Sequence, residues 1–470
     1  MRLARLSRVV LILAVAAIEL NCGETFRPIA LPQNPNPPDP EKLDFALVLS
    51  TNGPDVCSPP SATCDTQAHP GGASRIDVSG DSNVGTATVG LLPVHAALIP
   101  PNGGQAYVAN KLEDTISTFA TGTPATVITI SLPPGSAPVF VHTTQTDTVY
   151  SANSGLNTVS VISVGRNVVT KTIPVGVNPV ALAETPDGKK MYVVNQGSST
   201  VTVITTVDDV PGTSISVTGS PSWAAARFDS RFVYVLGSGV ITAIDTNTDQ
   251  PVPLTASVPN ASFAFLDPKL NRIYLTTTDN KLLTVDVSED APIALPAVDL
   301  SAVCSTGCVL DSVTTLPSNG QVYVASHSTN QTVCSHLDGV TDDAPPCVTT
   351  NVFVLQAATN MFLKTITTLH NVFANGALKG SKTDFPVVPF CETLSVRRHI
   401  APSSDGSKVY VANCDAGGTD IIKTADSSFV LNLPAPVSSL PPIGVIDPTL
   451  PPPPPPPQRP TFVLPAGKRD

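Results

Sequence analysis

The side chains best suited to holding a ligand occupy one repeated position of this sequence. That position lies ten to twelve residues before each tyrosine, and its occupants are His95, Phe140, Ala181, Trp223, Phe263, Ser312 and His399. Five of these seven residues carry aromatic or imidazole rings, which can stack on a flat ligand. Arg397 and Arg398, next to the last of them, could pair with a carboxylate or a phosphate. Ordinary core packing of the rings and solvation of the arginines are the alternative interpretations.

No sequence motif for catalysis accompanies these residues. The chain has no glycine-rich phosphate loop, no Gly-x-Ser-x-Gly and no His-Glu-x-x-His. Asp338, Asp342 and Asp343 lie close together, but their spacing is not that of an EF-hand calcium loop. We therefore predict no catalytic residue, no metal ligand and no cofactor.

Eight of the nine cysteines form an even set, which in an exported chain predicts disulfide bonds. Sequence alone does not choose among the pairings, but proximity favours Cys57–Cys64, Cys304–Cys308, Cys334–Cys347 and Cys391–Cys414. Each closed loop of this size would stabilise the fold by about 2–3 kcal/mol. A zinc site is the alternative, but the sequence has neither Cys-x-x-Cys nor closely spaced histidine pairs.

The first 21 residues are typical of a signal peptide. Arg2, Arg5 and Arg8 form a positive region, and residues 9–18 form an apolar stretch too short to span a bilayer. Cys22 and the proline-rich tether that follows it, residues 22–43, resemble the start of a bacterial lipoprotein. The resemblance implies export and lipidation of Cys22. Cleavage by the general signal peptidase without lipidation is the alternative.

The composition favours short strands over helical bundles and coiled coils. Of the 470 residues, 48 are proline and only 13% are charged. Apolar residues, at 41%, suffice for a buried core. The net charge of −11 opposes binding to a nucleic-acid backbone unless basic residues gather on one face.

A tyrosine-centred strand recurs along the chain and uses every tyrosine in it. The copies are separated by 43, 42, 42, 40, 49 and 87 residues, and they begin at Tyr107, Tyr150, Tyr192, Tyr234, Tyr274, Tyr323 and Tyr410. In the clearest unit, residues 178–217, four apolar stretches alternate with turns such as Pro-Asp-Gly at 186–188. Four short strands in about 42 residues are typical of a propeller blade, so we predict an all-β fold.

The Tyr-Val-Val-Asn motif at 192–195, with Pro-Asp-Gly before it and the strand at 200–204 after it, resembles the YVTN-type β-propeller repeat. YncE-like exported propellers belong to that family. The resemblance covers roughly residues 44–434 and implies a single propeller of four-stranded blades in the bacterial cell envelope. It does not identify a function, because related propellers include binding proteins, surface proteins and domains of redox enzymes.

Counting strands predicts eight blades. Seven full units follow three N-terminal strands at about 45–49, 75–78 and 85–90. The missing strand would come from the proline-rich C-terminal segment 435–470, at either 442–446 or 461–464. Such strand exchange removes the exposed edges of the ring. Seven blades with extra edge strands is the alternative.

Three segments stand outside the repeat. Loops at 332–350 and 373–391 are inserted late in the chain, and long loops of this kind are often functional. The seven prolines at 451–457 would form a stiff polyproline II spacer of roughly 22 Å. They could be a solvated tail or a docking segment for a partner.

These observations predict a non-catalytic, lipid-anchored envelope propeller that acts as a binding or scaffold module. Its partner would be an envelope protein or a glycan, the lipid would be its only contact with the membrane, and we expect a monomer. One alternative is a metal-assisted hydrolase or lactonase, which needs convergent acidic or imidazole groups at the channel mouth. The other is single-stranded DNA binding of the YncE type, which the net charge opposes.

Overall fold

The part of the chain that the structure describes consists of β-strands joined by turns. The computed structural model describes residues 44–52, 56–57, 69–99, 103–122, 126–144, 146–304, 307–316, 320–328, 332–333, 346–371, 387–388, 391, 394–415, 417–436 and 458–466. The predicted signal peptide, Cys22 and the tether lie outside these ranges. Among the described residues, no helix has the length and apolar character needed to cross a membrane.

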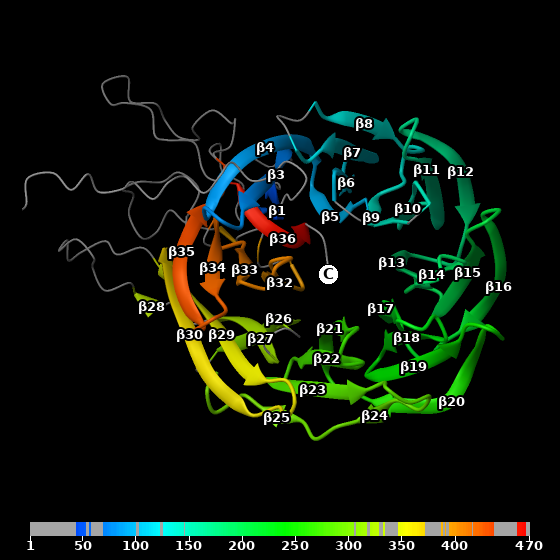
Figure 1. Ribbon diagram of the computed structural model, residues 1–470. Helices are drawn as coiled ribbons and strands as arrows, with labels where there is room; N and C mark the ends of the chain where they lie inside the picture. Colours follow the sequence, from blue (N-terminus) through cyan, green and yellow to red (C-terminus); the bar gives the residue numbers. More distant parts are fainter. Residues whose placement is uncertain are drawn as a thin grey trace, which may run out of the picture. The chain divides into compact units, whose positions relative to one another are not determined.

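Eight blades surround one axis (Figure 1). The first blade combines the two ends of the fold: from the inside outwards it contains β36 (Arg459–Ala466), β1 (Phe45–Asn52), β3 (His69–Asp77) and β4 (Ser82–Leu91). The predicted eight-bladed all-β propeller is therefore confirmed, and the seven-bladed alternative is excluded.

The other seven blades follow in chain order, each from its innermost strand outwards. Blade 2 contains β5 (Pro93–Leu98), β6 (Gln105–Asn110), β7 (Thr115–Ala120) and β8 (Ile128–Ser131); blade 3 contains β9 (Pro138–Thr143), β10 (Thr148–Asn153), β11 (Thr158–Ser163) and β12 (Val168–Pro174). Blade 4 contains β13 (Pro179–Glu184), β14 (Lys190–Asn195), β15 (Thr200–Thr205) and β16 (Val210–Ser216); blade 5 contains β17 (Pro221–Ala226), β18 (Phe232–Gly237), β19 (Val240–Asp245) and β20 (Gln250–Ser257).

The later blades are less regular. Blade 6 contains β21 (Ala261–Asp267), β22 (Arg272–Thr277) and β23 (Lys281–Asp286), with β24 (Ile293–Ala294) and β25 (Val298–Asp299) sharing its outer position. Blade 7 contains β26 (Cys308–Leu316), β27 (Gln321–Ser328), β29 (Pro346–Gln356) and β30 (Phe362–Asn371), with the short β28 (Thr332–Val333) beside β29. Blade 8 contains β32 (Arg398–Pro402), β33 (Lys408–Asn413), β34 (Gly418–Lys423) and β35 (Ser428–Pro434). Outside the blades, β2 (Val56–Cys57) pairs with β31 (Val387–Val388).

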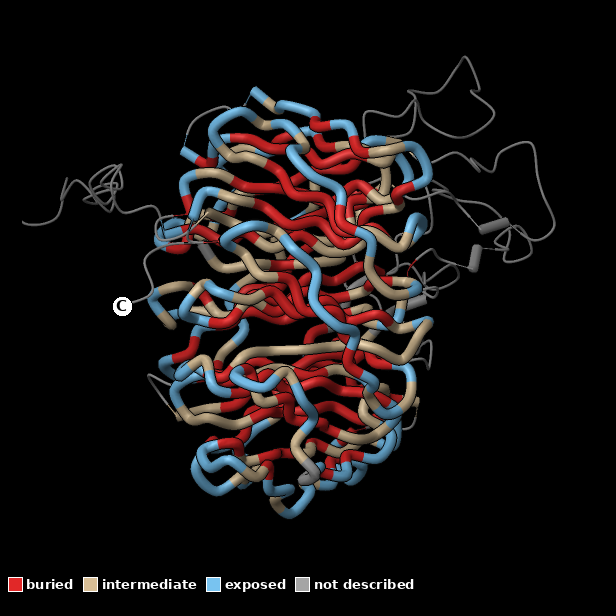
Figure 2. Tube along the Cα trace, turned by 90° about the vertical axis from the view of Figure 1, so that its right-hand side faces the viewer, coloured by how far each residue is buried: buried red, intermediate tan, exposed pale blue. Residues whose placement is uncertain are grey.

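The middle strands of each blade are buried on both sides, because each blade packs between two neighbours. The five residues 191–195 of β14 all have no exposed surface, whereas the outer strand β16 exposes all of its residues except Ile215. This explains why the sequences of the tyrosine strands are continuous apolar runs and do not alternate between apolar and polar residues. Figure 2 shows the buried residues along the strand interiors and the exposed residues at the turns.

The repeated tyrosine joins neighbouring blades. The hydroxyl of Tyr107 donates to Oδ1 of Asn167, which lies 3.0 Å away in the turn between the two outer strands of the next blade. Tyr192 donates in the same way to Oδ1 of Asp249, at 2.6 Å. Asn167 and Asp249 have φ values of 52° and 53°, a left-handed conformation that Asn and Asp adopt more readily than most residues. Tyr150 makes the same kind of bond to Asp209, so three of the seven tyrosines join their blade to an Asn or Asp turn of the next one.

The asparagine that ends the motif fixes the turn inside its own blade. The amide nitrogen of Asn195 donates to the hydroxyls of Thr200 and Thr202, at 3.2 and 2.9 Å. Asn110 and Asn153 make the same pair of bonds five and seven residues ahead. The spacing of five and seven residues between the asparagine and the two hydroxyl residues, which recurs in these three blades, therefore reflects hydrogen bonds that join the second strand to the third.

The ring is closed by the C-terminal strand. β36 pairs antiparallel with β1, with Leu464 opposite Leu47 and Phe462 opposite Leu49. The predicted closing strand at 461–464 is confirmed, and the propeller extends beyond residue 434, while the alternative at 442–446 lies outside the described residues. The backbone N–H of Gln458 donates to the carbonyl of Pro436 at 2.9 Å. The proline run at 451–457, itself outside the described residues, therefore belongs to a connection between two strands rather than to a tail.

Replacing Tyr192 with phenylalanine should lower the free energy of unfolding by about 1.5–3 kcal/mol, because it removes a buried hydrogen bond to a carboxylate. Tyr410 provides the matched control. Its hydroxyl is equally buried but has no hydrogen-bond partner among the described residues, so Tyr410→Phe should leave stability unchanged or raise it. Urea unfolding of both variants checks this, and equal losses would contradict the blade-joining role.

Candidate functional site

The repeated ring position lies on the innermost strand of its blade. In each of blades 2 to 8 it pairs with the residue two places after the tyrosine; for example, His95 is opposite Ala109 and His399 is opposite Ala412. Phe462 occupies this position in blade 1, opposite Leu49 of a strand in which Leu47 replaces the tyrosine. The sequence analysis missed Phe462 because no tyrosine follows it. Aligning the 461–464 segment with the other inner strands could have found it.

Five of the rings contact one another across blades. His95 stacks on Phe140 with their centroids 3.8 Å apart, and its other neighbour is Phe462 at 4.9 Å. Phe462 in turn lies 4.4 Å from His399, and His399 lies 6.0 Å from Phe263. We call these five residues the axial arc. The structure thus brings together four of the predicted ring residues through a fifth that was not predicted.

The other ring positions do not extend the arc. Trp223 packs against the core cluster shared by blades 5 and 6, while Ala181 is small and buried. Ser312 accepts a hydrogen bond from the backbone N–H of Ile400 in the next blade, at 3.1 Å. Each arc residue keeps part of its side chain exposed. Because the second strand and the adjacent blades cover the inner strands on their other sides, this exposure faces the axis.

Both histidines of the arc have a fixed tautomer. The backbone N–H of Val141 donates to Nδ1 of His95 at 3.4 Å, and that of Val463 donates to Nδ1 of His399 at 3.3 Å. A nitrogen that accepts a hydrogen bond carries no proton, so each neutral ring holds its proton on Nε2. In this tautomer both Nε2 atoms are hydrogen-bond donors.

Burial keeps both rings neutral. Enclosure by protein is the main reason that the pKa of His95 is lowered to about 3, with smaller contributions from the nearby imidazoles of His399 and His142. Enclosure likewise lowers the pKa of His399 to about 4. Among the described residues, no group of three or more His, Cys, Asp or Glu side chains could hold a metal ion.

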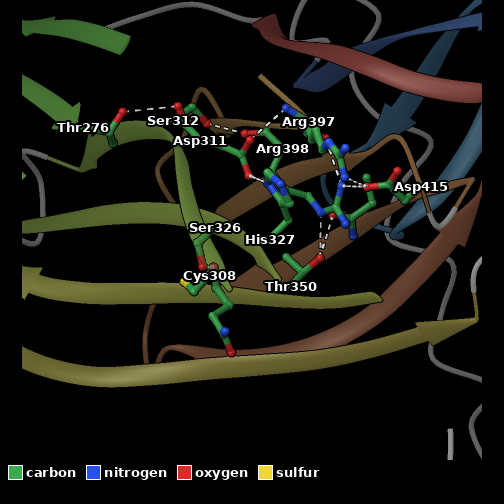
Figure 3. Close-up of polar contacts among 12 residues, drawn as sticks. Thr276, Cys308, Asp311, Ser312, Ser326, His327, Thr350, Arg397, Arg398 and Asp415 are labelled. Atoms are coloured by element: carbon green, nitrogen blue, oxygen red, sulfur yellow. Dashed lines mark hydrogen bonds and ion pairs between the residues drawn. The ribbon is translucent and has the colours of Figure 1, made fainter. Parts of the chain in front are cut away.

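The two arginines lie between blades 7 and 8 rather than in the arc (Figure 3). Arg398 has no exposed surface, so it is not solvated. Its Nη1 binds Oδ2 of Asp415 at 2.8 Å and its Nε donates to Oγ1 of Thr350 at 2.7 Å. Burial alone would raise the pKa of Asp415, but the charge and hydrogen bond of Arg398 hold it below its usual value. Arg397 adds a weaker contact, with Nη1 3.9 Å from the same oxygen.

A second buried pair continues this network. Oδ1 of Asp311 accepts the backbone N–H of Arg397 at 2.8 Å, and Oδ2 of Asp311 lies 2.8 Å from Nδ1 of His327 (Figure 3). Asp311 and His327 belong to blade 7, and Arg397 directly precedes the first strand of blade 8. The network therefore fixes the relative position of these two blades.

Two of the predicted disulfides are confirmed. Cys304 is bonded to Cys308 and Cys391 to Cys414, with Cα atoms 5.5 and 5.7 Å apart. The Cys391–Cys414 pair packs against Leu394 and against Leu92, which lies between blades 1 and 2. The side chains of the other predicted pairs, Cys57–Cys64 and Cys334–Cys347, lie outside the described residues. Both confirmed bonds lie on the face where the innermost strands begin.

That face also carries the long connections of the chain. In an antiparallel blade, the turn between the second and third strands and the link to the next blade leave from the same face. The four connections that follow β1, β27, β30 and β35 span residues 53–68, 329–345, 372–397 and 435–458, and all four leave from it. Every other connection between described blade strands has eight residues or fewer. The long connections belong to three adjacent blades, 7, 8 and 1, and we call this sector the insertion face.

Comparisons with known proteins support the fold and nothing finer. No protein-family description matches the chain, and no curated protein matches it. The dihydro-heme d1 dehydrogenase NirN, solved in complex with DHE, is 10% identical, covers 91% of this chain and 75% of its own, and superposes with a TM-score of 0.57. Two other structures superpose less well. A Lactobacillus plantarum protein is 17% identical, covers 68% of this chain and 96% of its own, and has a TM-score of 0.48. The virginiamycin B lyase of Staphylococcus aureus is 12% identical, covers 69% of this chain and 92% of its own, and has a TM-score of 0.46. Such likeness shows a β-propeller, a fold shared by enzymes and by proteins of unknown function.

Stability should fall as the pH falls from about 7 towards 4. In the unfolded chain a histidine takes up a proton near pH 6.5, whereas His95 and His399 in the fold do so only near 3 and 4. Between these values each histidine contributes a slope of up to about 1.4 kcal/mol per pH unit. Urea unfolding at pH 7.5, 6 and 5 measures the slope. An unchanged slope in the His95→Phe/His399→Phe variant would show that other groups cause it.

Proposed function

We propose that this protein is a non-catalytic binding module: an exported, YncE-like propeller of the YVTN type that holds an envelope protein or a glycan on its insertion face. Lipidation of Cys22 would attach it to a membrane, and the tether would let the propeller reach its partner. The single observation that carries the proposal is the gathering of all four long connections on one face of three adjacent blades.

Several features suit the insertion face to binding. The strands of blade 7 have 9, 8, 11 and 10 residues, against 6 or 7 in blade 4, so this blade is lengthened. The pairing of β2 with β31 joins the connection in blade 1 to the one before blade 8. The Cys391–Cys414 bond fixes the latter connection to blade 8. Loops held on a rigid scaffold are the usual carriers of binding.

The two alternatives have less support. A hydrolase or lactonase that uses His95 and His399 would need a metal ligand or a base, but both rings carry their proton on Nε2 and have lowered pKa values. Binding to single-stranded DNA would need a basic groove, which the net charge of −11 and the compensated, buried Arg398 do not favour.

Affinity capture tests the proposal. The oxidised soluble part, from Gly23 onward, is immobilised and exposed to envelope extract of its own source. We expect one partner at near-stoichiometric amounts, and we expect it to be lost when residues 373–386, which leave Cys391 in place, are replaced by a short Gly-Ser linker.

The control changes the opposite face. Val207 is 91% exposed in the turn between β15 and β16, on the face away from the insertions, so Val207→Arg should retain the partner. Recovery of nothing above a blank column, or a partner that survives the linker variant and is lost with Val207→Arg, would refute binding through the insertion face.

A further inference from the structure

We propose that the axial arc is a binding site for a planar, uncharged ring that carries carbonyl acceptors on opposite edges, as a quinone does. The proposal stands on the geometry of Phe140, His95, Phe462, His399 and Phe263, and it does not depend on the binding function proposed for the insertion face.

The arc offers ring surface near the axis. Its five rings are each partly exposed, and they contact one another from blade 3 through blades 2, 1 and 8 to blade 6. Ser312 of blade 7 is too small to separate His399 from Phe263. Partly exposed aromatic rings favour a flat ligand, which can lie against them and bury apolar surface.

The arc also offers two hydrogen-bond donors at matched places. Phe462 lies between His95 and His399, at 4.9 and 4.4 Å from their centroids. Because Nδ1 of each imidazole already accepts a backbone hydrogen bond, the remaining donor of each is Nε2–H. Neither Nε2 has a hydrogen bond to any residue that the structure describes. A ligand with one acceptor on each side of an aromatic centre would satisfy both.

The charges near the arc select against anions. His142, two residues beyond Phe140 on β9, lies 3.0 Å from the carboxylate of Glu184 on β13. The other oxygen of Glu184 is buried without a hydrogen-bond partner among the described residues. The carboxylate of Glu184, which contacts this neighbour of Phe140 on β9, would repel a negatively charged ligand, while neutral His95 and His399 would provide no compensating charge. The chemistry therefore favours an uncharged acceptor.

Closure of the ring completes the site. Phe462 is supplied by β36, so the two histidines are bridged only when the C-terminal strand is paired with β1. Trp223, the one tryptophan of the chain, lies on blade 5, four blades from Phe462 in a ring of eight. It is therefore on the opposite side of the axis and can report on a ligand bound there.

The test compares two ligands of the same shape. The quinone 2,3-dimethyl-1,4-naphthoquinone has two carbonyl acceptors and no free position for thiol addition, whereas 2,3-dimethylnaphthalene has none of the acceptors. Equilibrium dialysis gives both dissociation constants, and Trp223 fluorescence gives an independent signal from the axis. We expect the quinone to bind roughly 25-fold more tightly, since each hydrogen bond contributes about fivefold.

Substitutions distinguish the contribution of the two Nε2–H donors from that of the aromatic ring surfaces. His95→Phe and His399→Phe should each weaken the quinone about fivefold and change binding of the hydrocarbon less than twofold, while Phe462→Ala should weaken both ligands. Tyr192→Phe controls for the loss of a bond between blades, because it removes the bond to Asp249 between blades 4 and 5, neither of which contributes a residue to the arc; it should bind the quinone as the original chain does.

Three outcomes would overturn the proposal. Neither ligand binds; or both bind equally well to the original chain; or the advantage of the quinone survives in the His95→Phe/His399→Phe variant while thermal unfolding shows that this variant is folded. Stoichiometric zinc binding that displaces the quinone would also contradict the assigned tautomers.

Discussion

The structure depends on the pairing of β36 with β1, which turns a row of blades into a closed ring. A blade that packs on one side only would leave an apolar face in water, and an inner strand without its partner would leave a row of backbone groups unpaired. β1 is hydrogen-bonded on one side to β36 and on the other to β3. The bonds from Tyr107 to Asn167 and from Tyr192 to Asp249 add contacts in one direction around the ring, because each runs from a blade to a turn of the next one.

In blades 7 and 8 the departures from the repeat create contacts between the two blades. In blade 8 the positions that should hold the hydroxyl partners of Asn413 are Gly418 and Asp420, and Oδ1 of Asn413 instead accepts from Thr350 of blade 7. Thr350 also receives the buried guanidinium of Arg398. Blades 7 and 8 have thus exchanged the asparagine bonds within each blade for contacts between them. A rigid pair of blades is a suitable base for long connections, whereas blades 2 to 6 carry none of them.

The sequence predicted the features that depend on residues near each other along the chain. Tyrosine spacing and turn residues are local, so the blades and the Cys304–Cys308 and Cys391–Cys414 bonds were predictable. The closing strand is not local, and counting strands left two candidate segments for it, 442–446 and 461–464. Phe462 was not assigned to the ring because its blade has Leu47 in place of tyrosine and combines segments from the two ends of the fold. The burial of Arg398 was missed because its partners, Thr350 and Asp415, belong to two different blades.

Hydrogen exchange of the backbone amides of β36 tests the role of ring closure most directly. If the ring opens only when the whole propeller unfolds, the amide of Leu464 must exchange as slowly as those of Val193 and Val194 in the buried strand β14, and urea must affect all three equally. This is the result that closure by β36 predicts. Markedly faster exchange in β36, with β14 still protected, would show that the strand detaches locally and that the ring does not depend on it.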